Sequence, residues 1–244
     1  MIQGIYTTSH GMIQLMEKQD QIANNLANVN TTGYKESNLF TKTYQKYLAD
    51  SEQRPGVNRE IKPDQTYINY AEGTMMKTDG ALDCCVRGSG FFTILTPNGL
   101  GYTRNGNFSL DSQGYLVTND GSRVMGEEGY IKLDTGKPVL FGNQGEVIQG
   151  TEKMGQLRIT DFKKPYELLR EGNGLFVPKG PEVATVKSTD FAVKQGFLEG
   201  SNVNIIRTMT QMIAAARSFD ADQRAIVAQD ETLEKAVNVV GKVG

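Results

Sequence analysis

The apolar positions of residues 2–29 follow a repeating pattern that predicts an amphipathic helix. They lie alternately three and four residues apart, and the polar residues Thr8 and Gln19 interrupt the series. This spacing puts them on one stripe of a helix roughly 40 Å long. A cluster of Asn, Thr and Gly residues at 28–33 is expected to end the helix and turn the chain. The stripe consists of Ile5, Met12, Leu15, Ile22, Leu26 and Val29.

The C-terminal part shows the same pattern over a longer stretch. Steps of four and three residues from Ile205 give a series in which only Gln223 and Asp230 are polar. A helix from about residue 203 to 240 would be roughly 55 Å long. Ser201 or Asn202 is expected to cap its start by accepting a backbone N–H bond. The apolar members of the series are Ile205, Met209, Met212, Ala216, Phe219, Ile226, Leu233, Val237 and Val240.

Between these two stretches the helical period disappears, and short apolar runs alternate with turn-forming residues. The chain holds 27 Gly and only 7 Pro, which indicates many tight turns. The middle therefore predicts an antiparallel β domain. The polar stretch 40–63 is expected to begin as a helix and continue as an extended connector. Three dipeptides are typical of two-residue hairpin turns: Asn98-Gly99, Asn105-Gly106 and Asp120-Gly121.

These patterns together predict a mainly β central domain with long α-helical arms at both ends of the chain. An isolated helix is marginal in water, and its stability normally comes from packing its apolar face. The two arms can pair with each other and still leave surface for other subunits of a filament or tube. The pattern leaves open an alternative, a β domain with both helices folded onto its sheet. The expected divisions are an N-terminal arm at 1–34, a connector at 35–70, a β-rich domain at 71–197 and a C-terminal arm at 198–244.

Composition excludes several classes of function. The 26 basic and 28 acidic residues give a net charge of −2, and no run of Lys or Arg supplies the positive field that nucleic acid needs. The longest apolar stretches are far too short to insert into a membrane. The N-terminal residues 1–16 lack both the charged region and the continuous apolar region of a cleaved signal peptide. Export from the cytoplasm would therefore need another route.

The two cysteines, Cys84 and Cys85, are adjacent and have no distant partner, so a disulfide framework is excluded. Neighbouring residues of a strand point to opposite faces, so we expect one thiol in the core and the other exposed. His10 is the only histidine and has no metal ligand at a suitable spacing. The motif at 88–90, Gly-Ser-Gly, is too short for a phosphate-binding loop and indicates a turn.

No residue pattern supports catalysis, and we expect no catalytic, cofactor-binding or metal site. An enzyme that opens peptidoglycan would need a positioned carboxylate pair. The candidates Asp111, Asp120, Asp161 and Glu167 lie in polar, turn-rich surroundings, where acidic residues usually stabilise turns or face water. A soluble ligand-binding β module is the other alternative, but its ends would not need a stripe sustained over five heptads.

Specific motifs indicate a family. Residues 22–35, which read IANNLANVNTTGYK, closely resemble the N-terminal signature of flagellar rod and hook proteins. Residues 72–117 resemble the start of that family's β domain, with the motifs EGT, TDGALD, GSGFF and YTRNGNF. Residues 198–203 resemble the hinge before the family's C-terminal helix, and 212–236 resemble that helix. The resemblance covers both ends and half of the β domain, whereas residues 125–195 carry little that is diagnostic.

The resemblance implies a structural subunit of the flagellar basal-body rod, because hook subunits are usually much larger. The spelling of residues 215–220 favours a proximal over a distal rod protein, and a distal rod or hook-type axial subunit is the alternative. Rod proteins leave through the flagellar type III export apparatus without cleavage of a signal. The implied partners are that apparatus, other rod and hook-side axial subunits, and further copies of the chain.

The resemblance also implies an assembly interface formed by the helical arms, within or between chains. The asparagines of the N-terminal motif offer donors and acceptors for bonds between subunits. The expected hinge residues are Gly33, Gly200, Ser201 and Asn202. The expected interface consists of Ile5, Met12, Leu15, Ile22, Asn24, Asn25, Leu26, Asn28 and Val29 on the N-terminal arm, and of Met209, Met212, Phe219, Ile226, Leu233 and Val237 on the C-terminal arm.

Overall fold

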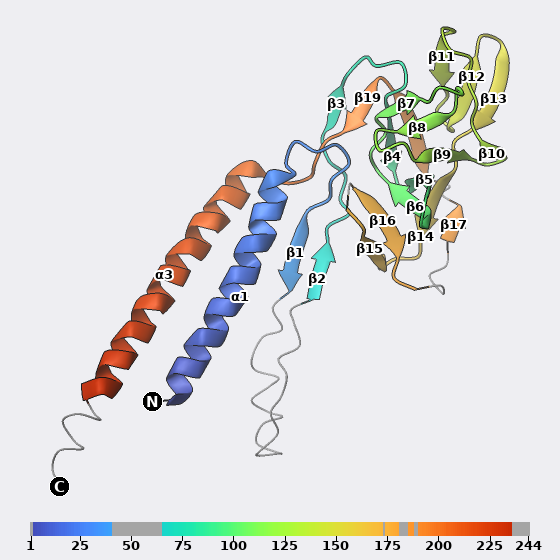
Figure 1. Cartoon of the computed structure of the whole chain (residues 1–244). Coiled ribbons are helices and arrows are strands. Elements are labelled where there is room, and N and C mark those ends of the chain that lie inside the picture. Colours follow the sequence, from blue (N-terminus) through green and yellow to red (C-terminus); the bar gives the residue numbers. More distant parts are fainter. Residues whose placement is uncertain (1, 41–64, 173, 181–184, 188–189, 236–244) are drawn as a thin grey trace. The chain divides into compact units, whose positions relative to one another are not determined.

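The computed structural model describes the chain except residues 1, 41–64, 173, 181–184, 188–189 and 236–244 (Figure 1). The chain folds into two compact units. The first, here called the helix unit, comprises residues 1–27, 36–69 and 203–244. The second, here called the β unit, comprises residues 28–35 and 70–202. The limits of the β unit at 70 and 202 lie close to the boundaries expected at 71 and 197, whereas the expected connector is shared out between the two units.

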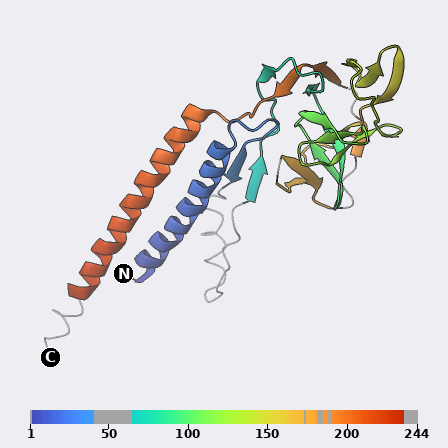
Figure 2. The ribbon, with the colours of Figure 1, turned by 45° about the horizontal axis from the view of Figure 1, so that its top comes forward.

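The helix unit contains the two long helices, α1 (Ile2–Ala27) and α3 (Ile205–Lys235). They lie side by side and run in opposite directions (Figures 1 and 2). Both predicted helices are therefore confirmed, and the predicted continuation of the second beyond 235 lies outside the described residues. No helix in the described part of the chain combines the length and apolar character that crossing a bilayer requires.

Helix α3 begins later than the sequence predicts, because another residue caps it. The side-chain oxygen of Asn204 accepts the backbone N–H of Arg207 at 3.0 Å. This is the bond expected of an N-cap residue. The prediction of Ser201 or Asn202 as the cap is therefore wrong. The amide of Asn202 instead donates to the carbonyl of Ala71 at 3.0 Å.

A two-stranded ribbon completes the described part of the helix unit. Strand β1 (Ser37–Phe40) pairs antiparallel with β2 (Gln65–Ile68), and α1 packs against β1. The helix expected to begin at Phe40 does not start there, since Phe40 ends β1. The rest of that expected segment lies outside the described residues.

The β unit consists mainly of antiparallel strands, as predicted. Its largest sheet has the order β15-β16-β6-β5-β9-β8-β7, with β10 on β9, β14 on β5 and β17 on β14. The strands of this sheet are β5 (Phe91–Thr96), β6 (Gly99–Thr103), β7 (Phe108–Leu110), β8 (Leu116–Thr118), β9 (Arg123–Gly126), β10 (Gly129–Tyr130), β14 (Ile159–Phe162), β15 (Leu168–Arg170), β16 (Leu175–Pro178) and β17 (Thr185–Lys187).

Smaller sheets complete the described part of the β unit. A three-stranded sheet has the order β11-β12-β13, β4 pairs with β18, and β3 pairs with β19. The last two pairs join strands from opposite ends of the unit, so the first and last segments of its sequence meet. The strands are β3 (Met75–Lys77), β4 (Cys84–Gly88), β11 (Val139–Phe141), β12 (Glu146–Gln149), β13 (Glu152–Gln156), β18 (Phe191–Gln195) and β19 (Phe197–Glu199).

Two of the three predicted hairpin turns are present. Strands β5 and β6 pair up to Thr96 opposite Gly99, and the N–H of Gly121 bonds to Thr118 between β8 and β9. The hairpin predicted at Asn105-Gly106 is wrong. The carbonyl of Gly106 instead accepts the N–H of Cys84 at 3.0 Å, and a side chain at 106 would collide with that backbone. This glycine serves a close approach of two segments.

Both cysteines are buried, so the expectation that one is exposed is wrong. Cys84 belongs to the main hydrophobic core with Phe92 and Ile94 of β5. Cys85 faces the other side of β4, where the sulfur of Met75 lies 3.7 Å away. Because β4 is covered on both faces, alternation cannot expose either thiol. Burial raises the pKa of both thiols.

Candidate functional site

The seam between the two helices contains the stripe predicted on α1. Its partly or fully buried positions are spaced alternately four and three residues apart, as the sequence indicates. The side chain of Ile5 lies outside the described residues, and Val29 follows the end of the helix. The seam positions on α1 are Thr8, Met12, Leu15, Gln19, Ile22 and Leu26.

On α3, every other position of the predicted stripe lies in the seam. Met212, Phe219, Ile226 and Leu233 lie in the seam, but the alternate positions are one residue earlier than expected. Met209 is 49% exposed, so it does not face α1 within the chain, and its place in an interface between chains stays a prediction. Thr208 and Met209 precede Met212 by four and three residues, so both lie close to the line along which the two helices touch. Hydrophobicity favours Met209, but Thr208 is the residue that lies in the seam. The alternate seam positions are Thr208, Ala215, Asp222 and Gln229.

The register of the pair follows from one close approach. A β-carbon built on Gly11 of α1 would lie 3.7 Å from a carboxylate oxygen of Asp222. Because the helices are antiparallel, counting in opposite directions from this point brings Leu15 level with Phe219 to within one residue. Polar residues at alternate seam layers fix register at a cost in stability. The pairing of the two helices is thus specific in register but buries little apolar surface.

A second apolar stripe on α3 faces away from the seam. Ile206 is 77% exposed, Met209 49% and Ile213 54%. Helix geometry puts this stripe roughly a third of a turn from the seam. On α1, Ile13 and Met16 are likewise exposed. Large apolar side chains gathered on one face of a soluble protein mark an interaction surface. We name Ile206, Met209 and Ile213 the outer face of α3.

The asparagines of the N-terminal motif are used within the chain. The amide of Asn25 donates to the carbonyl of Ser37 at 2.7 Å, and its oxygen accepts the Ser37 N–H at 3.0 Å. Asn24 donates to the carbonyl of Asp20, and Asn28 accepts the hydroxyl of Thr31. Asn25 is buried and holds α1 on β1, so any part it has in an interface is indirect.

The hinge residues lie in the β unit, where its first and last segments meet. Gly33 has φ +70°, and a side chain there would lie 2.5 Å from the backbone nitrogen of Asn105. A side chain at Gly73 would lie 1.9 Å from the carbonyl oxygen of Gly200. Both positions therefore need glycine, Gly33 for conformation and space and Gly73 for space. The sequence pointed to Gly33 and Gly200 but missed Gly73.

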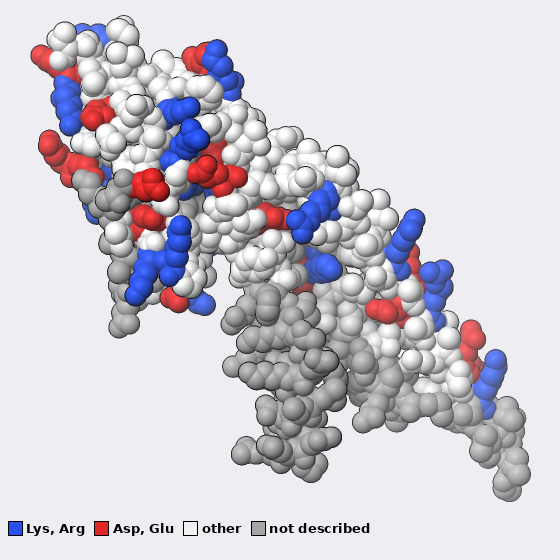
Figure 3. Space-filling model, turned by 180° about the vertical axis from the view of Figure 1, so that it is seen from behind, with Lys and Arg blue, Asp and Glu red and all other residues white. Residues whose placement is uncertain are grey.

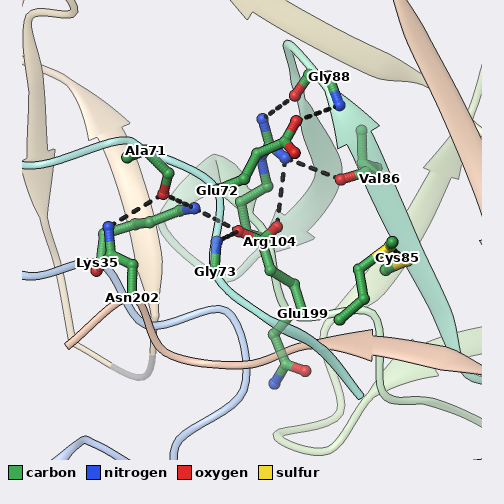
Figure 4. Close-up of polar contacts among 12 residues, drawn as sticks. Lys35, Ala71, Glu72, Gly73, Cys85, Val86, Gly88, Arg104, Glu199 and Asn202 are labelled. Atoms are coloured by element: carbon green, nitrogen blue, oxygen red, sulfur yellow. Dashed lines mark hydrogen bonds and ion pairs between the residues drawn. The ribbon is translucent and has the colours of Figure 1, made fainter. Parts of the chain in front are cut away.

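Three charged side chains converge at this meeting point (Figure 4). One carboxylate oxygen of Glu199 pairs with the ammonium of Lys35, and the other lies 3.3 Å from the Arg104 guanidinium. The three side chains are 1%, 3% and 4% exposed for Lys35, Glu199 and Arg104. We call this group the charge clasp. It places two cations around one anion, away from water.

Backbone groups satisfy most of the clasp's remaining hydrogen-bonding capacity. Lys35 donates to the carbonyl of Ala71 at 2.8 Å, and Glu199 accepts the Gly73 N–H at 3.0 Å. Arg104 donates to the carbonyls of Val86 and Gly88 on β4, at 3.0 and 2.7 Å. Burial lowers the pKa of Lys35, and the neighbouring Glu199 opposes that effect. Removing one partner of such a pair is costly, since it leaves a buried charge.

The clasp was not predicted from the sequence. Lys35, Arg104 and Glu199 each belong to a motif that carries the family resemblance, but nothing in the pattern indicates that the three meet. Arg170 comes from the region judged undiagnostic, donates to the carbonyl of Lys35 and stacks 4.3 Å from the Tyr34 ring. The signal that could have found them is a charged residue inside an otherwise uncharged motif, which demands a partner.

Two of the candidate acids of an enzyme, Asp111 and Asp120, support turns instead. Asp111 accepts the backbone N–H groups of Gln113 and Tyr115, each at 2.8 Å. Asp120 accepts the hydroxyls of Thr118 and Ser122. No three His, Cys, Asp or Glu side chains of the described residues are grouped to hold a metal ion. Acidic and basic side chains are interspersed on the face in Figure 3.

Comparisons with known proteins agree with this geometry. A family model described as "Flagella basal body rod protein" matches residues 5–35, and one described as "Flagellar hook protein FlgE/F/G D1 domain" matches 85–150. A third, "Flagellar basal body rod FlgEFG protein C-terminal", matches 194–239. The three matches cover the helices, the first part of the β unit and the end that carries Glu199.

Curated relatives align along the whole chain. The flagellar basal-body rod protein FlgG of Bacillus subtilis (strain 168) is 33% identical over 262 residues, covering 98% of this chain and 99% of the relative. FlgF of Caulobacter vibrioides is 29% identical over 245 residues, covering 100% of both chains. FlgG of Borreliella burgdorferi is 31% identical over 274 residues, covering 98% of this chain and 99% of the relative.

Proposed function

This chain belongs to the flagellar basal-body rod protein family and is a structural subunit of the rod, and we propose that it enters the rod through the outer face of α3. In this proposal, Ile206, Met209 and Ile213 pack against helices of neighbouring axial subunits, including further copies of the chain. The exposed outer face is the observation that carries the proposal. Completing the burial of these exposed side chains contributes about 1 kcal/mol or more each.

The paired helices then have distinct roles. The seam holds α1 and α3 together within one chain, through Met12, Leu15 and Ile22 and their counterparts Met212 and Phe219. The outer face remains for coaxial packing between chains, which is the axial architecture that the family suggests. Val237 and the side chain of Ile5, which also belong to the expected interface, lie outside the described residues.

A charge placed on the outer face tests this proposal without disturbing the seam. Ile213→Glu should prevent incorporation into basal bodies and abolish swimming, because it puts a carboxylate into an apolar contact. Ala214→Glu is the matched control, since Ala214 is also exposed and lies on a third face of α3. Incorporation is measured by immunoblotting of purified basal bodies. Normal incorporation of Ile213→Glu would rule out the outer face as the contact.

The proposal includes the route and place of the subunit. We propose that the flagellar type III apparatus exports the chain without a cleaved signal, as the resemblance to rod proteins implies. A strain without that apparatus should retain the chain in its cells, and release into the medium would contradict the route. We place the chain in the proximal rod, which antibody labelling along purified basal bodies tests directly.

A catalytic role has no support in the described residues. Asp111 and Asp120 are engaged in turns, and the relatives that align along the whole chain are named as rod proteins. We therefore propose that the chain acts only as a building element that carries torque from the motor towards hook and filament.

A further inference from the structure

We propose that Glu199 is the positioning residue that fastens together the segments joining the β unit to the helix unit. The inference rests on the proposed function and assigns one of its mechanical parts. The chain passes from one unit to the other at four places, after residues 27, 35, 69 and 202. Within the β unit, the segments next to these passages are 28–35, 70–73 and 199–202. We call these three segments the strap.

Hydrogen bonds join every pair of strap segments. Lys35 of the first segment donates its ammonium to the carbonyl of Ala71 in the second, at 2.8 Å. The amide of Asn202 in the third segment donates to the same carbonyl at 3.0 Å. The backbone N–H of Gly33 donates to the carbonyl of Glu199 at 2.7 Å, and that of Asn202 to Tyr34 at 3.4 Å. The Ala71 carbonyl is thus a shared acceptor for the two outer segments.

Glu199 links these bonds, because it contacts both of the other strap segments. Its carboxylate binds Lys35 of the first segment and the N–H of Gly73 in the second, while its backbone carbonyl binds Gly33. One side chain in the third segment therefore contacts both of the others. The side chain is buried, so water does not compete for these contacts.

Two arginines anchor the strap to the body of the β unit. Arg104 binds the second carboxylate oxygen of Glu199 and two carbonyls of β4. Arg170, at the end of β15, donates to the carbonyl of Lys35 and lies over the Tyr34 ring. The anchors come from separate places in the sheet system, so the strap is held at more than one point.

The arrangement has a mechanical consequence. A single flexible connection would let the two units twist independently under load. Three segments bonded side by side resist twisting, because sliding one segment breaks several bonds at the same time. A rod subunit works under torque, so we assign to the strap the transmission of load between its β unit and its helices, with Glu199 setting the position of each segment.

Amide hydrogen exchange measured by NMR on the purified full-length chain tests the positioning role. Glu199→Gln should reduce the protection of the Gly33, Gly73 and Asn202 amides together by roughly tenfold or more. The Thr93 amide, which bonds to Arg158 inside the sheet at 3.1 Å, should stay protected and reports an intact fold. Undiminished protection at Gly33 and Asn202 would overturn the inference.

A second variant keeps the test decisive if Glu199→Gln disturbs folding. Asn202→Ala removes a half-buried amide that bonds to the Ala71 carbonyl, and leaves the charge clasp intact. The variant should lose protection at the backbone N–H of position 202. The backbone N–H of Gly73, which bonds to the Glu199 carboxylate, should remain protected. The matched control is Asp134→Asn, which breaks the exposed Lys137–Asp134 ion pair elsewhere in the β unit. Loss of Gly73 protection in Asn202→Ala would contradict the role given to Glu199.

The rotation speed of tethered cells as a function of medium viscosity gives a readout that a merely stabilising role would not change. Cells with Asn202→Ala should contain basal bodies in normal number and lose speed as viscosity rises, whereas Asp134→Asn cells should follow the parent. If Asn202→Ala cells and parent cells rotate at equal speed at every viscosity, the strap's role in load transmission is overturned. That result would leave the proposed function standing, since it depends on incorporation and on the separate Ile213→Glu test.

Discussion

Lys35 and Glu199 are separated by 164 positions in the sequence and form a buried ion pair in the β unit. Lys35 ends the motif that follows α1, and Glu199 stands at the end of β19 in the motif that precedes α3. Each motif therefore supplies one half of a contact that neither can make alone. The two ends of the β unit are held together at this point.

The charge clasp predicts an asymmetry between its members. Glu199→Gln leaves two buried cations without a carboxylate and should lower the free energy of unfolding by about 3–5 kcal/mol. Lys35→Met leaves Glu199 paired with Arg104 and should cost less, about 1–2 kcal/mol. Urea unfolding followed by circular dichroism measures both. An equal or larger effect of Lys35→Met would contradict the view of Glu199 as the common partner.

The close approach of Gly73 to the backbone of Gly200 leaves no room for a side chain at position 73. A methyl group at this position would meet the carbonyl oxygen of Gly200 at 1.9 Å, so Gly73→Ala should lower the free energy of unfolding by about 1–3 kcal/mol. Gly180→Ala is the control, since its added carbon meets nothing within 4 Å and its φ is not positive. Thermal unfolding of the two variants should differ, and equal midpoints would refute the close approach.

Two tyrosines predict how stability changes at alkaline pH. Burial raises the pKa of Tyr70 and of Tyr166 from 10.0 to about 12. The rings lie 4.8 Å apart between centroids, and the Tyr166 hydroxyl donates to Asp161. Unfolded tyrosine loses its proton at lower pH than the folded side chains do. The stabilisation from both groups is therefore complete below pH 10 and disappears as pH rises from 10 through 12.

Ultraviolet absorbance of tyrosinate checks this expectation. In Tyr70→Phe the step near pH 12 should lose one group, and the fall of stability between pH 10 and 12 should become shallower. Lys35 acts in the opposite direction, because its pKa is lowered and the unfolded chain holds that proton to higher pH. Titration of every tyrosine near pH 10 would contradict the packing of the pair.

Asn25 predicts the strength of the attachment between α1 and β1. Asn25→Asp keeps an acceptor for the Ser37 N–H but places a second oxygen against the Ser37 carbonyl. The helix unit should lose about 1–3 kcal/mol of stability, seen as earlier loss of helical circular dichroism in urea. Asn24→Asp changes an exposed side chain of the same type and should have little effect. Similar losses in the two variants would argue against the bidentate contact.

Much of the fold could be predicted from the sequence because the helices carry a local period. The limits of α1 and the shared column Met212, Phe219, Ile226 and Leu233 follow from spacing alone. The choice between Met209 and Thr208 does not, since both lie beside that column. The position of the partner helix decides which of the two is buried. The buried residue is the polar Thr208, although hydrophobicity favours Met209.

Residues that meet across long separations could not be predicted. The charge clasp joins positions 35, 104 and 199, and no periodicity connects them. The burial of both Cys84 and Cys85 depends on the main core covering one face of β4 and on Met75 of β3 lying against the other, which is a property of the topology. Asn105-Gly106 reads as a hairpin turn, but its glycine is required where the Cys84 backbone passes. Tertiary contacts override local signals at each of these places.

Assembly through the outer face of α3 requires that neighbouring subunits cover this face in the rod. Thiol labelling of Ile213→Cys measures this directly, because the native Cys84 and Cys85 are buried and give little background. The introduced thiol should react readily with a maleimide in the purified chain and resist labelling in intact basal bodies from swimming cells. Equally fast labelling in both states would show that the outer face stays open to water, and would contradict assembly through it.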